Sequence, residues 1–355
     1  MKIVVVQPVV PHYRVPFFKE LIKHYRNIRF FASPIDDIDV KSVSSDVFPY
    51  TPLGPVKRRF GVVWQKKVVF LIRLLRRGDV LVINGNPRYI STLILIVLSG
   101  LKGVKVVWWG QGWSSKTTNL SFRIRCRLML LCDRILLYTE SEVKLIDVKN
   151  KGNVYYLNNG IDNHEIQKLR KIYDPDTRNN SILFIGRVTE KSHLPLLIKG
   201  MKNLDCSVKL HVIGDGELLK LCKTLTEEFN IGQRIVFHGA MTDEKGIADI
   251  ANNCKIFVYP GDVGLSLIHG MNYGLPAVIH SSTSRHMPES ACHRAGENGE
   301  TFRRGNENDL CRIIDSLLQN GEKLKLYSEN NIVVTANDFN VRRMCERFND
   351  MVSSL

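Results

Sequence analysis

The sequence predicts an α/β protein made of two Rossmann-like domains that face each other across a cleft. Its 355 residues exceed the usual size of a single domain. Short apolar runs alternate with segments of helical period, which is typical of parallel sheets covered by helices. A polar stretch at residues 173–180 interrupts this alternation and indicates a linker. We therefore expect an N-terminal domain over 1–170, a C-terminal domain over 171–330, and an amphipathic helix over 331–355 that packs back toward the N-terminal domain.

The elements of the first half follow from their apolar pattern. Buried parallel strands are apolar on both faces, whereas helices repeat their apolar positions every three to four residues. The expected strands are residues 2–6, 28–31, 80–84, 105–109, 134–138 and 154–157. The expected helices are residues 15–24, 61–77, 88–98, 120–131 and 140–148.

The same alternation restarts after the polar stretch. The expected strands are residues 181–185, 209–213, 235–238, 256–259 and 277–279. The expected helices are residues 194–201, 217–229, 245–251, 265–273 and 308–319. In the last segment the apolar side chains Val341, Met344, Phe348 and Met351 recur at helical spacing, which predicts an amphipathic terminal helix.

The composition excludes several classes of protein. Apolar residues make up 44% and charged residues 24%, as in ordinary globular chains. The longest strongly apolar run, residues 90–98, is shorter than the roughly 20 residues that cross a bilayer, and we expect no signal peptide. None of the eight cysteines has CxxC spacing, so we expect no zinc and read them as thiols of a cytoplasmic protein.

The positive charge lies in the first half of the chain. Residues 1–170 hold 28 Lys and Arg against 12 Asp and Glu, while residues 171–355 hold 22 against 23. Nucleic acid, an anionic membrane, an anionic substrate, or a plain solvated face would each account for this. Nucleic-acid motifs are absent. The basic residues alternate with bulky apolar ones over 61–77, and a basic amphipathic helix lies well in a membrane interface. We therefore favour peripheral attachment to the inner face of a membrane.

Polar residues follow three strands of the second half. Arg187 and Lys191 come directly after one strand, at the sheet edge where open α/β folds bind ligands, and such cations bind phosphate oxygens. The alternative is that they are two ordinary exposed loop residues. Gly214 and Gly216 follow another strand as a GxG turn, which alone is a weak signal.

The third strand runs into a glycine-rich helix start. Gly261 and Gly264 permit close approach of a ligand to the backbone. The free amides at the start of this helix, together with the helix dipole, favour a diphosphate. His269 lies one turn further on, where it would bond a ribose hydroxyl or a phosphate; the alternative is an ordinary core or surface histidine.

The order of these pieces resembles the donor-binding domain of glycosyltransferase family 4, a retaining family of GT-B fold. The similar stretches are GRVTEK (186–191), HVIGDGELL (211–219), RIVFHGAMTDE (234–244), CKIFVYPGDVGLSLIHGMNYGLPAVI (254–279) and the passage 154–162 between the domains. The resemblance implies a nucleotide-sugar donor in the second domain and an acceptor in the first. It places Arg187 and Lys191 on the donor diphosphate, together with the amides of Gly264, Leu265 and Ser266 at the helix start.

The chain departs from this family at two positions. The family's two glutamates, eight positions apart, fall on Gly261 and His269, so both carboxylates that would touch the sugar and the ribose are missing. Asp262 and His269 are the nearest polar substitutes. We therefore expect an enzyme from a divergent branch of the family. One alternative is an inert nucleotide-sugar-binding protein, and another is a nucleotide-sugar epimerase of the same architecture.

In the first domain, His12, Tyr13 and Arg14 correspond to the family's acceptor-side loop. Gln111 stands where the family commonly has a histidine; Gln is no base, but it would orient the donor sugar, and core packing is the alternative for the Trp-rich run around it. The DxD at residues 37–39 falls in an early loop, so we expect no metal.

The sequence thus predicts a retaining hexosyltransferase that needs no cofactor. It would use a nucleotide sugar, UDP-linked rather than GDP-linked, and a lipid-linked or cell-surface polysaccharide acceptor of the lipopolysaccharide or capsule kind.

Overall fold

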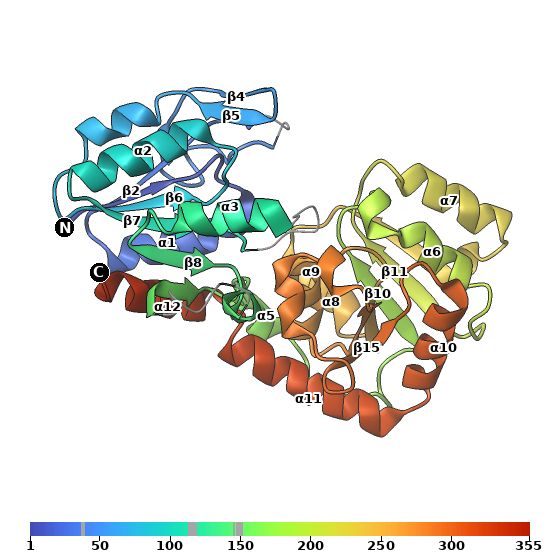
Figure 1. Ribbon diagram of the computed structural model, residues 1–355. Coiled ribbons are helices and arrows are strands. Elements are labelled where there is room, and N and C mark those ends of the chain that lie inside the picture. Colours follow the sequence, from blue (N-terminus) through green and yellow to red (C-terminus); the bar gives the residue numbers. More distant parts are fainter. Residues whose placement is uncertain (37–39, 113–118, 145, 147–151) are drawn as a thin grey trace. The chain divides into compact units, whose positions relative to one another are not determined.

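The computed structural model describes residues 1–36, 40–112, 119–144, 146 and 152–355 (Figure 1). The chain divides into two compact units. Unit 1 comprises Met1–Asn159 together with Val341–Leu355, and unit 2 comprises Gly160–Asn340. Residue 170, where the sequence suggests a domain boundary, lies inside unit 2.

Unit 1 is built on a seven-stranded parallel sheet of order β3-β2-β1-β6-β7-β8-β9. Its strands are β1 (Ile3–Val6), β2 (Ile28–Ala32), β3 (Thr51–Pro52), β6 (Val80–Asn84), β7 (Lys105–Trp109), β8 (Arg134–Leu137) and β9 (Val154–Tyr156). Its helices are the 3-10 turn η1 (His12–Arg14), α1 (Val15–His24), α2 (Ile90–Leu101), α3 (Asn119–Met129), α4 (Glu140–Val143) and α12 (Val341–Ser353).

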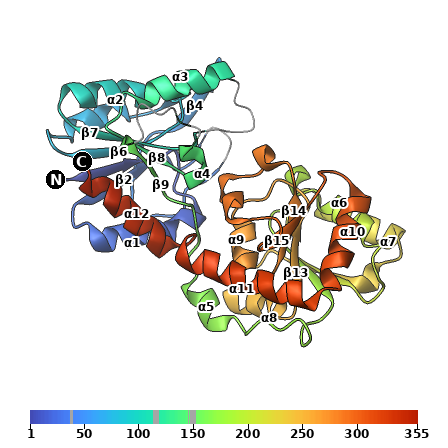
Figure 2. The same cartoon turned by 60° about the horizontal axis from the view of Figure 1, so that its bottom comes forward.

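Both faces of this sheet are covered. Ile3 and Val5 of β1 pack in the cluster that includes α1 and α12, whereas Val4 and Val6 pack in the cluster that includes α2. Helices α1 and α12 lie side by side in Figures 1 and 2, although their sequences are more than 300 residues apart. Their contact includes Phe17 and Phe348, with ring centroids 6.1 Å apart. The end of the chain therefore completes the core of unit 1.

The helix expected over residues 61–77 is wrong. Two antiparallel strands, β4 (Val56–Arg59) and β5 (Val62–Gln65), form a hairpin here, followed by the 3-10 helix η2 (Val69–Arg73). Phe60 and Gly61 join the strands, with φ of 49° and 79°. Two residues of positive φ make the turn that matches the twist of a hairpin. The basic residues are therefore displayed on a hairpin and not on an amphipathic helix.

Unit 2 is built on a six-stranded parallel sheet of order β12-β11-β10-β13-β14-β15. Its strands are β10 (Ser181–Ile185), β11 (Lys209–Ile213), β12 (Ile235–Gly239), β13 (Ile256–Tyr259), β14 (Ala277–His280) and β15 (Gly299–Phe302). Its α-helices are α5 (His164–Leu169), α6 (Leu194–Gly200), α7 (Leu219–Glu228), α8 (Glu244–Ala251), α9 (Leu265–Asn272), α10 (Glu307–Leu318) and α11 (Gly321–Asn337). Short 3-10 turns are η4 (Glu190–Ser192), η5 (Gly232–Arg234), η6 (Thr283–Arg285) and η7 (Pro288–Cys292).

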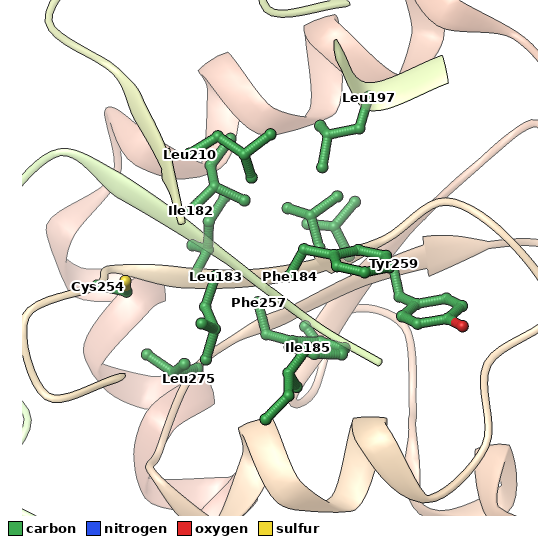
Figure 3. Packing of buried hydrophobic residues seen from close by; sticks show 14 of the residues in the cluster. Ile182, Leu183, Phe184, Ile185, Leu197, Leu210, Cys254, Phe257, Tyr259 and Leu275 are labelled. Carbon is green, nitrogen blue, oxygen red and sulfur yellow. The ribbon is translucent and has the colours of Figure 1, made fainter. Parts of the chain in front are cut away.

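The central strands of unit 2 are buried on both faces, as their apolar sequences require. Figure 3 shows Ile182, Leu183, Phe184 and Ile185 of β10 packed among neighbouring apolar side chains. The ring of Phe184 stacks on that of Tyr259, with centroids 4.9 Å apart. This packing fixes the ends of β10 and β13 next to each other.

The polar stretch at residues 173–180 is not a free linker, so that prediction is wrong. Tyr173 is buried and donates its hydroxyl hydrogen to the carbonyl of Lys255 at 2.7 Å. The buried Arg178 lies over the Tyr173 ring and donates to the carbonyls of Ala251 and Cys254. A polar segment can thus belong to the body of a domain when its side chains satisfy buried carbonyl groups.

Candidate functional site

The order of strands in unit 2 creates a switch point between β10 and β13. From β10 the chain proceeds to β11 and β12 on one side, and later returns to add β13, β14 and β15 on the other. The loops that leave β10 and β13 therefore diverge, which opens the carboxyl edge where α/β sheets bind ligands. The sequence-predicted residues Arg187, Asp262 and Gly264 all follow these two strands.

Glycines hold the loops at this edge together. Gly214 and Gly216, after β11, have φ of 149° and 155°. A Cβ at Gly214 would lie 1.8 Å from the carbonyl oxygen of Gly186, and one at Gly216 would lie 2.4 Å from that of Val188. These glycines are needed for loop packing against the segment after β10; a direct contact with a ligand stays a prediction.

Arg187 and Lys191 are both exposed at this edge. Neither forms an ion pair among the residues that the structure describes. Burial raises the pKa of the Tyr259 phenol to about 12, and the positive charge of Arg187 opposes this rise. Two cations without carboxylate partners are therefore available to an anionic ligand.

Helix α9 begins beside these cations. Gly264 is its N-cap, and the amides of the first turn of a helix have no intrahelical acceptor. A Cβ on Gly186 would lie 3.1 Å from the hydroxyl oxygen of Ser266, so the helix start lies against the loop that carries Arg187. The start of α9 and the loop that carries Arg187 therefore lie together at this edge of the sheet.

Gly261 has a different role from the one that we predicted. A Cβ there would lie 2.0 Å from the carbonyl oxygen of Lys191, and the next amide, that of Asp262, donates to the same oxygen at 2.8 Å. Its close approach in the structure is thus to the turn η4, and a contact with a ligand stays a prediction. A glutamate at this position would require that turn to move.

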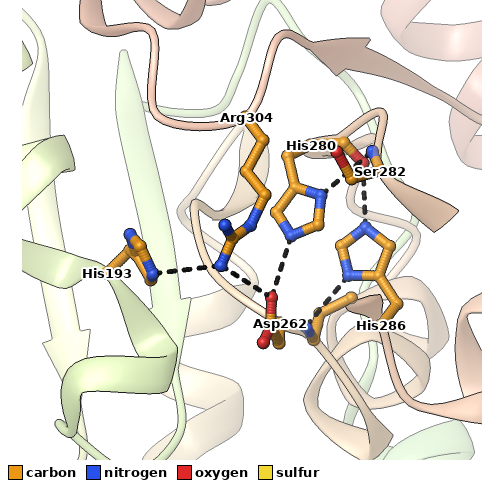
Figure 4. Close-up of polar contacts among 7 residues, drawn as sticks. His193, Asp262, His280, Ser282, His286 and Arg304 are labelled. Carbon is orange, nitrogen blue, oxygen red and sulfur yellow. Dashed lines mark hydrogen bonds and ion pairs between the residues drawn. The ribbon is translucent and has the colours of Figure 1, made fainter. Parts of the chain in front are cut away.

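Asp262 belongs to a cluster of polar side chains at the ends of four strands (Figure 4). Its Oδ1 lies 3.3 Å from Nε2 of His280 and 3.4 Å from Nη2 of Arg304, which in turn lies 3.4 Å from Nε2 of His193. The His280 and His286 rings stack with centroids 3.8 Å apart. Asp262 is therefore positioned by its neighbours.

Both stacked histidines are neutral in this geometry. Nδ1 of His280 accepts the amide of Ser282, so its Nε2 carries the hydrogen that points to Asp262. Nδ1 of His286 accepts the amide of Val263, and its Nε2 donates to the carbonyl of His280. Burial, followed by the electrostatic effect of the neighbouring His286, lowers the pKa of His280 to about 4. The pair ties the loop before α9 to the end of β14.

His269 has a carboxylate partner that sequence reasoning missed. Its Nε2 lies 2.8 Å from Oε1 of Glu244, the first residue of α8, and the same oxygen accepts the hydroxyl of Tyr273 at 2.5 Å. Burial would raise the pKa of Glu244, but the hydrogen bonds from His269 and Tyr273 outweigh it and lower the pKa. A carboxylate is therefore present next to His269, supplied by another helix.

The remaining predicted residues lie at the carboxyl edge of the sheet of unit 1. His12, Tyr13 and Arg14 form η1, which follows β1, and Gln111 follows β7. His12 and Tyr13 are exposed, whereas Arg14 is buried. The carbonyl of Gln111 accepts a hydrogen bond from Arg125 at 3.2 Å.

Two findings concern metals and membranes. Among the described residues no group of His, Cys, Asp or Glu is arranged to hold a metal ion, and the DxD at 37–39 lies outside the described residues. No helix in the described ranges has the length and apolar character needed to span a bilayer.

Comparisons with known proteins agree with this geometry. Residues 165–333 match the family described as Glycosyl transferases group 1. Among solved structures, HepE of Anabaena in complex with UDP has a TM-score of 0.76 at 14% identity, with 100% of both chains covered. The lipopolysaccharide outer core galactosyltransferase WaaB has a TM-score of 0.74 at 14% identity, covering 100% of this chain and 99% of that one. A search of curated proteins finds no significant match.

Sucrose-phosphate synthase of Thermosynechococcus elongatus has the same fold, with a TM-score of 0.68 at 12% identity over 100% of this chain and 99% of that one. The predicted GT-B fold is therefore confirmed. The family match covers residues 165–333, most of unit 2, and for this part of the chain it confirms the predicted resemblance to the group 1 glycosyltransferases, which correspond to glycosyltransferase family 4, a retaining family.

Proposed function

We propose that this enzyme transfers a sugar from a UDP-sugar, with retention, to a lipid-linked or cell-surface polysaccharide acceptor. The observation that carries the donor assignment is the joint position of Arg187, Lys191 and the start of α9 at the switch point of unit 2. The solved structures of HepE with UDP and with UDP-glucose support the choice of UDP.

The proposed chemistry follows from these groups. Arg187 and Lys191 stabilise the negative charge that grows on the diphosphate as the bond to the sugar breaks, and the amides of Gly264, Leu265 and Ser266 bond its oxygens. The acceptor hydroxyl attacks from the face that the diphosphate leaves and gives its proton to the leaving phosphate oxygen. No side chain is required as a base in this reaction. The role that we assign to Gln111 is to orient the transferred sugar.

Two residues take over the contacts of the missing glutamates. Asp262 binds a sugar hydroxyl through the carboxylate oxygen that the cluster of Figure 4 leaves unused. In the neutral tautomer whose Nε2 donates to Glu244, Nδ1 of His269 is an acceptor, and in this form it binds the ribose hydroxyl group. Glu244 fixes this tautomer. The pair His269–Glu244 thus performs the acceptor role of a single glutamate.

We also propose that unit 1 docks on an anionic membrane through the hairpin β4–β5 and the turn η2. The tip residue Phe60 is 90% exposed, and Trp64 and Phe70 are also exposed. Arg58, Arg59, Lys66 and Lys67 are exposed around them. Exposed rings with surrounding cations match the interfacial and headgroup layers of an anionic leaflet. The enzyme would meet its lipid-linked acceptor there.

A thermal-shift screen with UDP, GDP and their sugar conjugates, followed by a transfer and hydrolysis assay, tests the donor assignment. A ligand that binds only the folded state raises the melting temperature. We expect stabilisation by UDP and release of UDP from its sugar conjugate. Stabilisation without any turnover would support the alternative of an inert nucleotide-sugar-binding protein, and interconversion of free UDP-sugars would support an epimerase.

A further inference from the structure

Unit 1 contains a buried arginine that has no acidic partner within the part of the chain that the structure describes. Arg14, the last residue of η1, is 8% exposed. Among the described residues its side chain makes no hydrogen bond or ion pair, and its Nη1 is enclosed without an acceptor. An arginine cannot lose its charge in a protein, and a buried guanidinium normally finds a carboxylate or carbonyl oxygen. This position is therefore incomplete.

Aromatic rings surround the guanidinium. Its Cζ lies 4.5 Å from the ring centroid of Trp109, 5.1 Å from that of Tyr138 and 5.7 Å from that of Tyr13. Ring faces attract the cation, but they offer no acceptor to N–H groups in the guanidinium plane. The rings hold Arg14 in place and leave its hydrogen-bonding capacity for another molecule.

The carboxylate of Glu142, on the helix that follows β8, accepts hydrogen bonds from the backbone. Its Oε1 accepts the amide of Gly112 at 2.9 Å, and its Oε2 accepts the amides of Tyr138 and Thr139, each at 3.1 Å. The neighbouring Arg125 offers a contrast, because it donates to the carbonyls of Gln111 and Gly112. Of these two arginines, only Arg14 lacks acceptors within the described part of the chain.

The position of Arg14 is that of a ligand site. It follows β1, while Trp109 ends β7 and Tyr138 follows β8, so the three meet at the carboxyl edge of the parallel sheet. Tyr13, which precedes Arg14, is 53% exposed and presents a ring on which a sugar can stack.

We propose that Arg14 and its aromatic neighbours form a subsite for a phosphate ester on the acceptor sugar. Two oxygens of the phosphate would accept the paired N–H groups of Arg14, and Tyr13 would cover the sugar. This inference rests on the proposed function, since it names the class of acceptor: a sugar that carries a phosphate, as in a lipid-linked sugar phosphate.

Calorimetric titration of the full chain in saturating UDP tests the subsite, because UDP occupies the donor site. The probes are glucose 1-phosphate and methyl glucoside. We expect the wild-type protein to bind glucose 1-phosphate at least about tenfold more tightly than methyl glucoside. Arg14→Met should abolish this preference while leaving UDP binding unchanged, and the exposed control Arg26→Met should keep it.

Equal affinity of Arg14→Met and wild type for glucose 1-phosphate would overturn the proposal, as would a wild-type protein that does not prefer the phosphate. Arg14→Lys keeps the positive charge but lacks the planar pair of N–H donors, and it replaces Arg14→Met in the test if that variant fails to fold. It should bind glucose 1-phosphate more weakly than wild type, and undiminished binding would again overturn the proposal. Failure of the protein to bind UDP would contradict the proposed function and not the subsite. The glucose 1-phosphate titration would then be repeated with the double variant Arg187→Ala/Lys191→Ala.

Discussion

At the carboxyl edge of unit 2 the polar side chains satisfy one another: Asp262 lies between His280 and Arg304, and His269 pairs with Glu244. At the corresponding edge of unit 1, Arg14 is buried among rings without an acceptor in the described part of the chain, and the hairpin displays Phe60 to solvent. The donor unit is thus preorganised by internal contacts, whereas unit 1 leaves interactions open for other molecules. The following predictions test this difference.

The largest effect is expected at the hairpin of unit 1. Replacing Arg58, Arg59, Lys66 and Lys67 by Gln should weaken binding to anionic vesicles by about 4 kcal/mol, because each basic residue contributes about 1 kcal/mol near an anionic leaflet. Vesicle sedimentation measures this. The same change at the exposed lysines 199, 209, 220 and 245 of unit 2 should have little effect, and unaltered sedimentation of the hairpin variant would exclude this surface.

The close packing of Gly261 against the turn η4 in unit 2 leads us to expect that this position tolerates no side chain. Gly261→Ala should lower the free energy of unfolding by about 3 kcal/mol, since its Cβ would overlap the carbonyl of Lys191. A Cβ at Gly232 would meet no atom within 4 Å, so Gly232→Ala should change stability by about 0.5 kcal/mol at most. Urea unfolding distinguishes them, and similar losses would contradict the packing argument.

As the pH is lowered, the free energy of unfolding of unit 2 should begin to fall at a higher pH than that of unit 1. His280 has a pKa of about 4 in the folded protein against 6.5 when free, so the unfolded chain takes up its proton first as the pH falls. The free energy of unfolding should fall by about 2 kcal/mol on going from pH 6.5 toward 4. All four tryptophans belong to residues 1–159 and report on unit 1.

Urea unfolding at pH 7 and pH 5 measures this difference. At pH 5 the transition seen by far-ultraviolet circular dichroism should move to lower urea than the tryptophan transition. His280→Gln should remove part of the shift. Parallel movement of both probes with no effect of His280→Gln would show that the buried histidines do not decide acid stability.

The smallest effect concerns Glu244. Glu244→Ala leaves His269 and Tyr273 without their acceptor, and we expect the donor KM to rise about tenfold. His269→Ala should raise it by a similar factor, and the double variant by no more than either alone. Exposed Glu227 is the control. Unchanged kinetics in His269→Ala would return His269 to a purely structural role.

Much of the fold could be predicted because buried parallel strands are apolar throughout; β6 and β10 lie at the predicted residues. The hairpin was missed since the apolar residues of 61–77 also satisfy a helical spacing, and Phe60–Gly61 lacks the usual Asn-Gly signal of a tight turn. Strand β15 and helix α11 were missed as well. The sequence of β15, GETF, has no apolar alternation, and the buried face of α11 includes Ser328, Asn331 and Thr335.

The candidate site was predictable only where it follows a strand directly. Arg187 and the start of α9 could be placed at one edge because β10 and β13 were recognised. Glu244 and Arg304 could not be placed there, because Glu244 begins a helix and Arg304 precedes one, and only the fold brings these helices to this edge. A histidine such as His280 carries no local signal that distinguishes a structural partner from an isolated core residue.

The central claim is that the edge of unit 2 binds the diphosphate of the donor, and titration of UDP into wild-type, Arg187→Ala and Lys191→Ala proteins tests it most directly. Each substitution should weaken binding by about tenfold or more, because each removes a charged hydrogen-bond donor. Lys220→Ala, an exposed lysine of α7, should bind UDP as wild type does. Wild-type affinity in both the Arg187 and the Lys191 variants would contradict the account.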